Sequence, residues 1–566
     1  MAEAPREGAD GAVGTPAVAE AADGHVAQAA PDQPAAETIA SENRRSAALA
    51  TLCLVLFLTF LDITIVSVAL AGIQTQLAAG VSSLQWVVGA YALTFASTML
   101  AFGTIGDQFG RKKILLIGIC IFIAGALMAG LSVLVTSGST ALAIVIAGRA
   151  VMGLGAAASE PGTLSMLRHI YPEYISRNWA LGVWAAVSGS ALALGPVVGG
   201  ALVYAWGWPA IFWFNVLFGL IALIAAVIVL PENSDPTPGR RMDLAGAVFG
   251  AVALGALIFA VIEAESNGFG SGRVIALLSV SAIFAAAFLW QESRASHPLL
   301  DLKFLRVPQF ATPIIVAFCA YFATFAIFFF TALFLEEVTG YNGGQIATVF
   351  LPMTILMILA SLLAGRWTGS VGIRWSIVGG CAAFAAGLLW TNVVISPSPP
   401  YLPLAAALAL TGIGIGACVV PITSSVLAVV PPERSGMAAS ATNTSREVGA
   451  VMGVAVLGAI VIGKLQTALV ASLSRLGLPK GIQTIVIDGV LTGKEPSVGE
   501  TAKQAPAGQA KLVNEVIHAT YSAFQSGLHD ALYLSAGLVA GAGILTAITI
   551  TVASDRAQAH DYARST

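Results

Sequence analysis

The chain has 566 residues, of which 57% are hydrophobic and only 10% are charged, and its mean hydropathy is +0.85. This composition excludes a soluble globular protein, and the net charge of −3 gives no sign of a nucleic-acid partner. The five cysteines stand singly inside apolar runs, without the spacing of a disulfide pair or a metal site. We therefore interpret them as packing residues.

Apolar runs long enough to cross a hydrocarbon core of about 30 Å recur from Ala47 to Val552. Fourteen such runs begin near residues 47, 82, 112, 140, 178, 209, 243, 274, 310, 344, 375, 401, 438 and 530. They predict an all-α integral membrane protein. Lysine and arginine gather in alternate connections, which the positive-inside rule places in the cytoplasm. The even number of spans then places both termini there.

The segments outside the spans differ in composition. Residues 1–45 are rich in Ala, Pro, Asp and Glu and predict a disordered cytoplasmic tail without a signal peptide. Residues 464–528 form an extracytoplasmic loop of unusual length, which we interpret as a lid or as a passive spacer. Its last part, VNEVIHATYSAFQSGLHD, can form an amphipathic helix at the membrane surface. Residues 554–566 are expected to be a second cytoplasmic tail.

The stretch Gly148–Leu202 combines a buried charge with an unusual run of glycines. Arg149 lies about nine residues into an apolar run, close to mid-bilayer, where an arginine costs from about 2.5 kcal/mol to far more. It should therefore face protein or water and have a partner, although an arginine can also snorkel to the interface. Pro196 removes an amide and bends the next helix, while four glycines let another helix approach its backbone. These glycines are Gly182, Gly195, Gly199 and Gly200.

The first half of the chain recurs in the second. The loop GTIGDQFGRKK recurs as a weaker repeat 262 residues later. The glycines of the hairpin recur at a constant offset of 254, where Gly182, Gly195 and Gly199 match Gly436, Gly449 and Gly453. Such repeats place a binding site between two halves, with access alternating as one half rocks on the other. Because the charges decay in the second copy, we expect the first half to carry the ion chemistry.

These motifs resemble the major facilitator superfamily. GTIGDQFGRKK resembles its loop signature, RAVMGLGAA its fourth-helix signature, and GVWAAVSGSALALGPVVGG the fifth-helix signature of its antiporters. LDITIVSVAL resembles the first-helix signature of its fourteen-spanner drug:proton antiporters. The chain departs from these patterns at Ser67, Ala71 and Ala191. The resemblance implies a six-helix bundle at residues 46–231, two inserted helices at 232–292, and a second six-helix bundle at 293–553.

Three charged residues are candidates for proton coupling. Asp62 lies about fifteen residues into the first helix, in the outer half of the membrane like Arg149. Burial disfavours a charged carboxylate and a nearby arginine favours it, so Asp62 could exchange protons as the cavity changes sides. A static ion pair is the alternative. Glu160, on the helix face of Arg149, is a candidate for substrate recognition or a second proton site, unless it pairs with a loop arginine.

The loop motif carries a candidate gate. Asp107 and Arg111 are four residues apart, and an intervening glycine permits a tight turn and a charge network with neighbouring helices. The resemblance makes these residues, with Gly103 and Gly110, a cytoplasmic gate. Solvated loop charges are the alternative.

Other residues are candidates for the substrate cavity. The aromatic stripe in FCAYFATFAIFFFTALF can bind flat lipophilic molecules or cations, or it can face lipid. Arg446 and Glu447 point about 100° apart on their helix, so one can line the cavity while the other approaches a different helix. The candidates are Tyr91, Met152, Trp184, Tyr321, Phe322, Phe325, Asn443, Arg446 and Glu447. Asn443 and Leu356 stand where exporters of organic cations in the family often have acids, which weakens a dication exporter.

The sequence therefore predicts a proton-coupled antiporter that exports amphipathic drugs, dyes or antibiotics across the bacterial cytoplasmic membrane. We expect no ATP site, since no Walker sequence is present, and no cofactor or metal, since the proton gradient drives transport. We expect a monomer whose partners are its substrate, protons and the bilayer. A dedicated exporter of one endogenous metabolite or self-made antibiotic is the alternative, and a non-transporting sensor is a remote one. An enzyme is not expected, because no histidine falls in an HExxH motif or near a nucleophile signature.

Overall fold

The computed structural model describes residues 35–77, 79, 81–232, 243–296, 298–341, 343–475 and 510–550. The chain divides into two compact units, Met1–Arg44 and Arg45–Thr566, and the contacts discussed below all lie within the second. The predicted tails fall mainly on residues 1–34 and 551–566, which lie outside the described residues.

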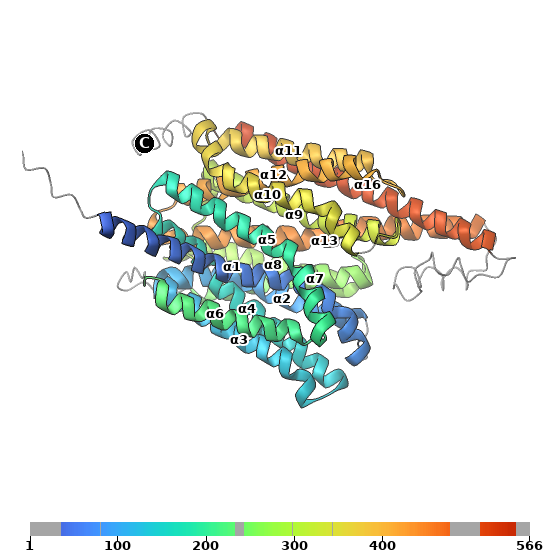
Figure 1. The fold of residues 1–566 in the computed structure, drawn as a ribbon, viewed down its shortest axis with the longest axis horizontal. Helices are drawn as coiled ribbons and strands as arrows, with labels where there is room; N and C mark the ends of the chain where they lie inside the picture. The colour runs from blue at the N-terminus through green and yellow to red at the C-terminus, as the bar shows by residue number, and fades with distance from the viewer. Residues whose placement is uncertain are drawn as a thin grey trace, which may run out of the picture. The chain divides into compact units, whose positions relative to one another are not determined.

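The described residues form long α-helices and no strand. The first eight are α1 (Ala35–Leu77), α2 (Val81–Phe109), α3 (Arg111–Val135), α4 (Gly138–Ile170), α5 (Tyr174–Trp206), α6 (Ala210–Val229), α7 (Leu244–Asn267) and α8 (Gly272–Arg294). The others are α9 (Pro308–Glu337), α10 (Gly343–Val371), α11 (Ile373–Val394), α12 (Tyr401–Ala428), α13 (Ser435–Arg475) and α16 (Ala510–Thr549). Figure 1 shows these helices lying side by side, with their axes roughly along one direction.

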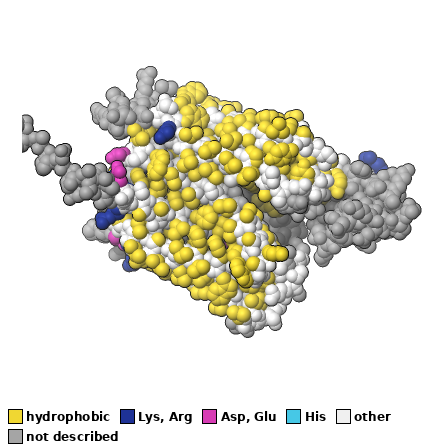
Figure 2. Space-filling model, in the orientation of Figure 1, with side chains coloured by type: hydrophobic (Ala, Val, Ile, Leu, Met, Phe, Trp, Pro, Cys, Tyr) yellow, Lys and Arg dark blue, Asp and Glu magenta, His cyan; other side chains and the backbone are white. Residues whose placement is uncertain are grey.

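Thirteen of the described helices are long and apolar enough to cross a membrane. Helix α5 is a fourteenth if its two parts, Tyr174–Leu192 and Leu194–Trp206, which are bent by 40°, count as one span. Figure 2 shows hydrophobic side chains over most of the drawn face, with charged side chains mainly at one end of the helices. The prediction of an all-α multi-pass membrane protein is therefore confirmed.

The apolar side chains gather in two main cores. One core belongs mostly to α1–α6, which we call the first bundle, and the other to α9–α13 and α16, which we call the second bundle. Helices α7 and α8 pack on each other, and α7 also packs on α2 and α13. We call the end of the helices where α2 meets α3 and α12 meets α13 the charged end. The domain boundaries expected from the sequence stay predictions.

The repeated glycines occupy equivalent positions at the contact between the bundles. A Cβ atom on Gly182 of α5 would lie 2.7 Å from the Ser361 carbonyl oxygen of α10. In the same way, a Cβ atom on Gly436 of α13 would collide with the Gly103 carbonyl oxygen of α2. Two symmetry-related helix pairs, α5 with α10 and α13 with α2, therefore touch backbone to backbone across the interface.

The other repeated glycines pack each bundle internally. Gly195 and Gly199 of α5 lie against α1, and their counterparts Gly449 and Gly453 of α13 lie against the α9 backbone. Helices α5 and α13, which contact the opposite bundle, thus also pack closely on the first helix of their own bundle. Gly200 is different, because a Cβ atom there would meet no described atom within 4 Å. The expectation that Gly200 also permits close packing is wrong.

Pro196 bends α5 as predicted, and the bend exposes a carbonyl. A proline in a helix cannot donate to the carbonyl four residues earlier, which here belongs to Leu192. The Thr64 hydroxyl of α1 donates to that Leu192 oxygen at 3.0 Å. A hydroxyl from a neighbouring helix therefore replaces the missing amide, as the absence of water in a membrane requires.

The same arrangement occurs at two prolines of the second bundle. The carbonyl four residues before Pro313 accepts a hydrogen bond from the Ser425 hydroxyl at 2.7 Å. The carbonyl four residues before Pro352 accepts one from the Tyr401 hydroxyl at 3.4 Å. In each case the donor comes from α12, so one helix supplies the hydroxyl at both prolines.

We predict that Thr64→Val destabilises the protein by about 1–3 kcal/mol, because the Leu192 carbonyl is left without a donor in an apolar surrounding. Pro196→Ala restores the amide, so the double variant should lose less than the sum of the single variants. Unfolding in mixed micelles measures these differences. Thr51→Val, which removes a hydroxyl bonded only within α1, is the control. Strictly additive losses would contradict this account.

Two helices extend beyond the predicted limits. Helix α1 begins at Ala35, earlier than the tail boundary at residue 45, because Ala, Glu and Arg between residues 35 and 45 favour a helix. Helix α13 continues to Arg475, and α16 begins at Ala510. Both therefore enter the predicted loop 464–528, of which residues 476–509 lie outside the described residues.

The predicted amphipathic segment before the last span is the first part of α16 and not a separate surface helix. Helices α13 and α16 pack on each other, and Lys464 Nζ of α13 lies 2.9 Å from Asp530 Oδ2 of α16. Leu465, Leu469 and Ala523 form a small apolar cluster beside this ion pair. The part of the segment from residue 521 onward, whose side chains the structure describes, therefore contacts α13 through Ala523 and Asp530.

Candidate functional site

A buried ion pair joins α1 to α4 within the first bundle. Arg149 Nη1 donates to Asp62 Oδ2, and both residues are fully buried. Asn215 Nδ2 of α6 donates to Asp62 Oδ1 at 2.6 Å, and Arg149 Nε donates to the Val87 carbonyl of α2 at 2.9 Å. The guanidinium also lies 4.5 Å from the centre of the Tyr91 ring. Helices α1, α2, α4 and α6 of the first bundle thus converge on one ion pair.

This geometry excludes an Arg149 that snorkels to the surface, and it defines what protonation does. A proton on Asp62 would neutralise the carboxylate and remove its ion pair with Arg149. The guanidinium would keep the Val87 carbonyl and the Tyr91 ring, which are neutral partners. Since a buried cation without an anion is unfavourable, such a step favours rearrangement of the bundle.

A second polar network crosses from α4 to the second bundle. Asn443 Nδ2 of α13 donates to Glu160 Oε1 at 3.0 Å, and Arg446 Nη1 donates to Asn443 Oδ1 at 3.0 Å. Arg446 Nη2 donates to Thr423 Oγ1 of α12 at 2.8 Å. Glu160 Oε2 and Arg446 Nε are buried without a hydrogen-bond partner. Glu160 therefore contacts an amide of the opposite bundle and not a loop arginine.

Aromatic rings from both bundles enclose Arg446. Its guanidinium carbon lies 5.6 Å from the centre of the Trp184 ring of α5 and 5.5 Å from the Tyr321 ring of α9. Glu447, the next residue, is also buried and interacts electrostatically with Glu160. Two carboxylates and one guanidinium thus share a buried space between the bundles.

Tyr91 lies between the two polar clusters. It interacts electrostatically with Asp62, Arg149, Glu160 and Glu447. Its hydroxyl donates to a backbone carbonyl of α1 at 3.3 Å, which fixes the ring beside the ion pair.

The other cavity candidates take different places. Met152 lies against α3 at Gly125, inside the first bundle and not between the bundles, because two facing glycines bring α3 and α4 together there. Phe322 is buried, whereas Phe329, farther along the same stripe, is 50% exposed. The stripe thus divides between the interior and the surface. The Phe325 side chain lies outside the described residues.

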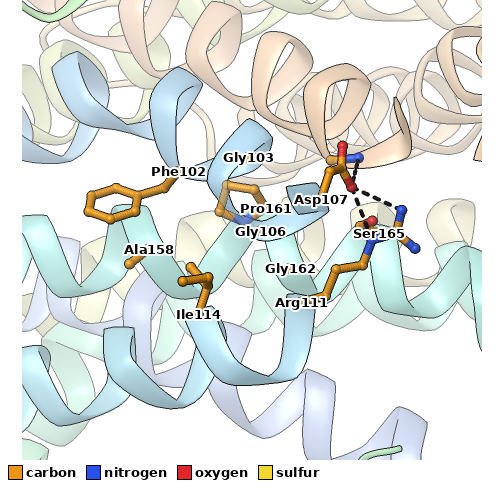
Figure 3. A pocket seen from close by; sticks show the side chains of 11 residues that line it. Phe102, Gly103, Gly106, Asp107, Arg111, Ile114, Ala158, Pro161, Gly162 and Ser165 are labelled. Atoms are coloured by element: carbon orange, nitrogen blue, oxygen red, sulfur yellow. Dashed lines mark hydrogen bonds and ion pairs between the residues drawn. The ribbon is translucent and has the colours of Figure 1, made fainter. Parts of the chain in front are cut away.

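At the charged end, Asp107 of α2 caps the first turn of α13. Its Oδ1 accepts from the Gly436 amide and its Oδ2 from the Met437 amide, both at 3.1 Å. Arg111 Nη2 donates to Asp107 Oδ1 at 2.9 Å and to the Pro432 carbonyl at 2.8 Å. Figure 3 shows the Asp107 and Arg111 side chains pointing toward each other. The carboxylate is favourable here because a helix N-terminus presents free amides and a positive dipole end.

Neighbouring contacts close the same end. The Ser165 and Ser435 hydroxyls lie 2.9 Å apart, and Arg168 Nη1 donates to the Val430 carbonyl at 2.9 Å. Gly110, which joins α2 to α3, has a φ of 105°, a conformation that favours glycine. Asp107 and Arg111 are 3% and 8% exposed, so they are not solvated loop charges.

The connection between α8 and α9 reinforces this closure. Arg434 Nη1, just before α13, lies 2.6 Å from Asp301 Oδ2. The Thr104 hydroxyl of α2 donates to the Leu299 carbonyl at 3.2 Å, and Glu292 Oε2 of α8 accepts from the Leu300 amide at 3.1 Å. This segment thus contacts α2 and the turn that precedes α13.

Sequence reasoning missed several residues of the site. Asn215 had a visible signal, because it is a lone amide in the otherwise apolar helix α6. Thr423, Asp301 and Arg434 had none, since one hydroxyl or one loop charge is ordinary in any sequence. Their roles depend on which helices face each other.

The fold and the site together define a class of protein. Two repeated helical bundles, a buried polar network between them and a closed set of contacts at one end are the architecture of a secondary membrane transporter. The chain is therefore a multi-pass membrane transporter.

Sequence comparison places the chain within that class. Residues 52–454 match the Major Facilitator Superfamily, and the chain belongs to this family. It is 33% identical to the multidrug resistance protein Stp of Mycobacterium tuberculosis over 77% of this chain and 79% of the relative. It is 29% identical to the tetracenomycin C resistance and export protein of Streptomyces glaucescens over 89% of this chain and 90% of the relative.

A solved structure supports the fold. The human organic anion transporter MFSD10 superposes with a TM-score of 0.55 at 15% identity, covering 89% of this chain and 99% of that chain. At this identity the likeness concerns the fold alone. These two relatives are a drug resistance protein and an antibiotic resistance and export protein, and a third relative is the drug efflux pump JefA of Mycobacterium tuberculosis, 30% identical over 87% of this chain and 95% of the relative. The names agree with the resemblance to the drug efflux branch of the superfamily.

Proposed function

We propose that the protein is a proton-coupled antiporter that exports amphipathic drugs, dyes or antibiotics from bacterial cells. The drug-resistance relatives support export of such compounds. The observation that carries proton coupling is the buried Asp62–Arg149 pair, a titratable group inside one moving bundle. We place the charged end and both termini in the cytoplasm because lysine and arginine gather in the connections there.

In the proposed cycle the two bundles rock about the network that joins them. The contacts of Asp107 hold the cytoplasmic end closed, so Asp62 would receive its proton from outside. Neutral Asp62 releases Arg149, the first bundle rearranges, and the cytoplasmic end opens. The proton then leaves inward as substrate binds. Each inward proton is driven by about 2.3 kcal/mol per 100 mV of membrane potential, so neither ATP nor a cofactor is required.

The test uses purified protein in liposomes with an imposed pH gradient and no ATP. We predict ethidium movement that depends on the gradient and that Asp62→Asn abolishes, because an amide cannot carry the proton. Asp530→Asn, which changes a half-exposed acid on α16, is the matched control and should transport as the wild type does. Equal gradient-driven transport by Asp62→Asn and the wild type would exclude Asp62 from the coupling step.

The tetracenomycin relative supports a second candidate, a dedicated exporter of one metabolite or self-made antibiotic. Such a protein would leave ethidium in place while a neutral or anionic natural product moves under the same gradient. A non-transporting sensor would bind a ligand but show no flux in any of these vesicles.

A further inference from the structure

The network between the bundles contains two buried atoms whose bonding capacity is unused. Glu160 Oε2 has no donor, and Arg446 Nε has no acceptor. Both residues are nine-tenths or more buried, at 1% and 2% exposure. Buried polar atoms are nearly always hydrogen-bonded, so two orphans of opposite character in one network indicate a place for a ligand.

Arg446 differs from the other fully buried arginine. Arg149 has Asp62 as its anion, whereas the hydrogen bonds of Arg446 within the described chain go only to a neutral amide and a neutral hydroxyl. A guanidinium in a desolvated site binds a carboxylate strongly, because its hydrogen bonds to an anion are short and geometrically matched. Glu160 and Glu447 interact with Arg446 electrostatically, but among the described residues no carboxylate is hydrogen-bonded to its guanidinium.

Asn443 shows the chemistry that fits between the two charges. Its carboxamide offers an N–H to Glu160 and an oxygen to Arg446, each at 3.0 Å. A ligand that replaces these bonds must present a donor and an acceptor side by side. An ammonium beside a carboxylate does so with full charges, and it also supplies partners for Glu160 Oε2 and Arg446 Nε.

The surroundings restrict the rest of the ligand. The rings of Trp184 and Tyr321 cover Arg446 from opposite bundles, so they separate when the bundles rock apart. Flat aromatic groups bind such rings by stacking. An aromatic body attached to the charged pair would therefore lie between α5 and α9.

We propose that the buried network between the bundles, which we call the central site, binds zwitterionic aromatic amphipaths. The ammonium of the substrate pairs with Glu160, and its carboxylate pairs with Arg446. This inference rests on the proposed function and names its substrate class. A zwitterion carries no net charge outward, so the membrane potential acts on the proton alone.

A matched set of fluorescent probes tests the inference by binding to protein in nanodiscs. The set is Nε-dansyl-lysine, which is zwitterionic, its methyl ester, which keeps only the ammonium, and its Nα-acetyl derivative, which keeps only the carboxylate. We expect the zwitterion to bind at least about tenfold more tightly than either derivative, since each lost bond involves a charged group.

The variants separate the two contacts. Arg446→Gln should bind the zwitterion no more tightly than the methyl ester. Glu160→Gln should bind the zwitterion no more tightly than the Nα-acetyl derivative. Arg446→Lys should restore part of the first preference, because it keeps the charge without the planar donor set. Asp530→Asn is the control. A merely structural role would weaken all three probes equally.

The outcomes distinguish this inference from the proposed function. Wild-type protein that binds the three probes alike, or binds none, while still moving ethidium on a gradient overturns the zwitterion site and leaves the antiporter. Wild-type protein without gradient-driven flux of any substrate overturns the antiporter, whatever the probes show. Variants that keep the wild-type preferences overturn the assignment to Glu160 and Arg446.

Discussion

Asp107→Asn is expected to open the charged end and to lower export about tenfold or more. We call the contacts of Asp107 with α13 and Arg111 the latch. The asparagine keeps one acceptor oxygen, but its NH₂ group faces a backbone N–H of α13, so two donors meet and one hydrogen bond is lost. The ion pair with Arg111 is lost as well. A hydrogen bond to a charged group contributes about 1.5–3 kcal/mol. Since about 1.4 kcal/mol is tenfold in an equilibrium constant, losing even one such bond shifts the conformational balance by an order of magnitude.

A cysteine at position 440 measures this opening directly. Ser440 of α13 is fully buried, and its side chain lies against α2 at Gly103. In a cysteine-free background, Ser440→Cys should react slowly with a hydrophilic maleimide, and much faster when Asp107→Asn is added. Glu173→Gln, which alters an exposed acid in the next connection, is the control. Lost export with unchanged labelling would show that Asp107 acts otherwise than as a latch.

The latch exists in only one of the two repeats. Gly365 of α10 lies against the Asn178 backbone of α5, as Gly103 of α2 lies against α13. The position equivalent to Asp107, however, is Gly369, and Glu173 at the start of α5 makes no side-chain cap. Gly103 and Gly365 keep both helix contacts close, whereas a carboxylate, that of Asp107, bonds across only the contact of α2 with α13. This asymmetry agrees with the expectation that the first half carries the ion chemistry.

The sequence predicted those features that depend on one helix at a time. The spans follow from apolar length, the α5 bend from Pro196, and a partner for Arg149 from its depth in the membrane. The glycine repeat also predicted the close contacts, because a missing side chain has the same effect wherever the helix packs. Gly200 is the exception, since among the described residues no atom lies within 4 Å of the place where its Cβ atom would stand.

The cross-bundle network could not be predicted in the same way. Glu160 and Asn443 are 283 residues apart, and their contact depends on how α4 and α13 are rotated and shifted relative to each other. A shift of one residue turns a helix by about 100°, which would place a different side chain opposite Glu160. Residues such as Thr423 and Asp301 therefore emerge only from the three-dimensional arrangement.

The Asp62–Arg149 pair gives the largest expected effect on stability. Removing one partner of a buried ion pair leaves an uncompensated charge, so Arg149→Gln should destabilise the protein by about 3–5 kcal/mol. The double variant Asp62→Asn/Arg149→Gln has no buried charge there and should recover most of that loss. Unfolding in mixed micelles measures the stability, and gradient-driven ethidium flux measures the function.

These two measurements separate a coupling site from a static lock. A static ion pair only holds α1 to α4, so a double variant that regains stability should also regain transport. A proton site loses its titratable group in the double variant, so we expect gradient-driven transport to stay absent although the fold is restored. Facilitated movement of dye down its own gradient can survive in that variant, because the cavity residues on α5, α9 and α13 are unchanged. Restored coupling would instead assign the pair to structure and require another carboxylate, such as Glu160, to carry the proton.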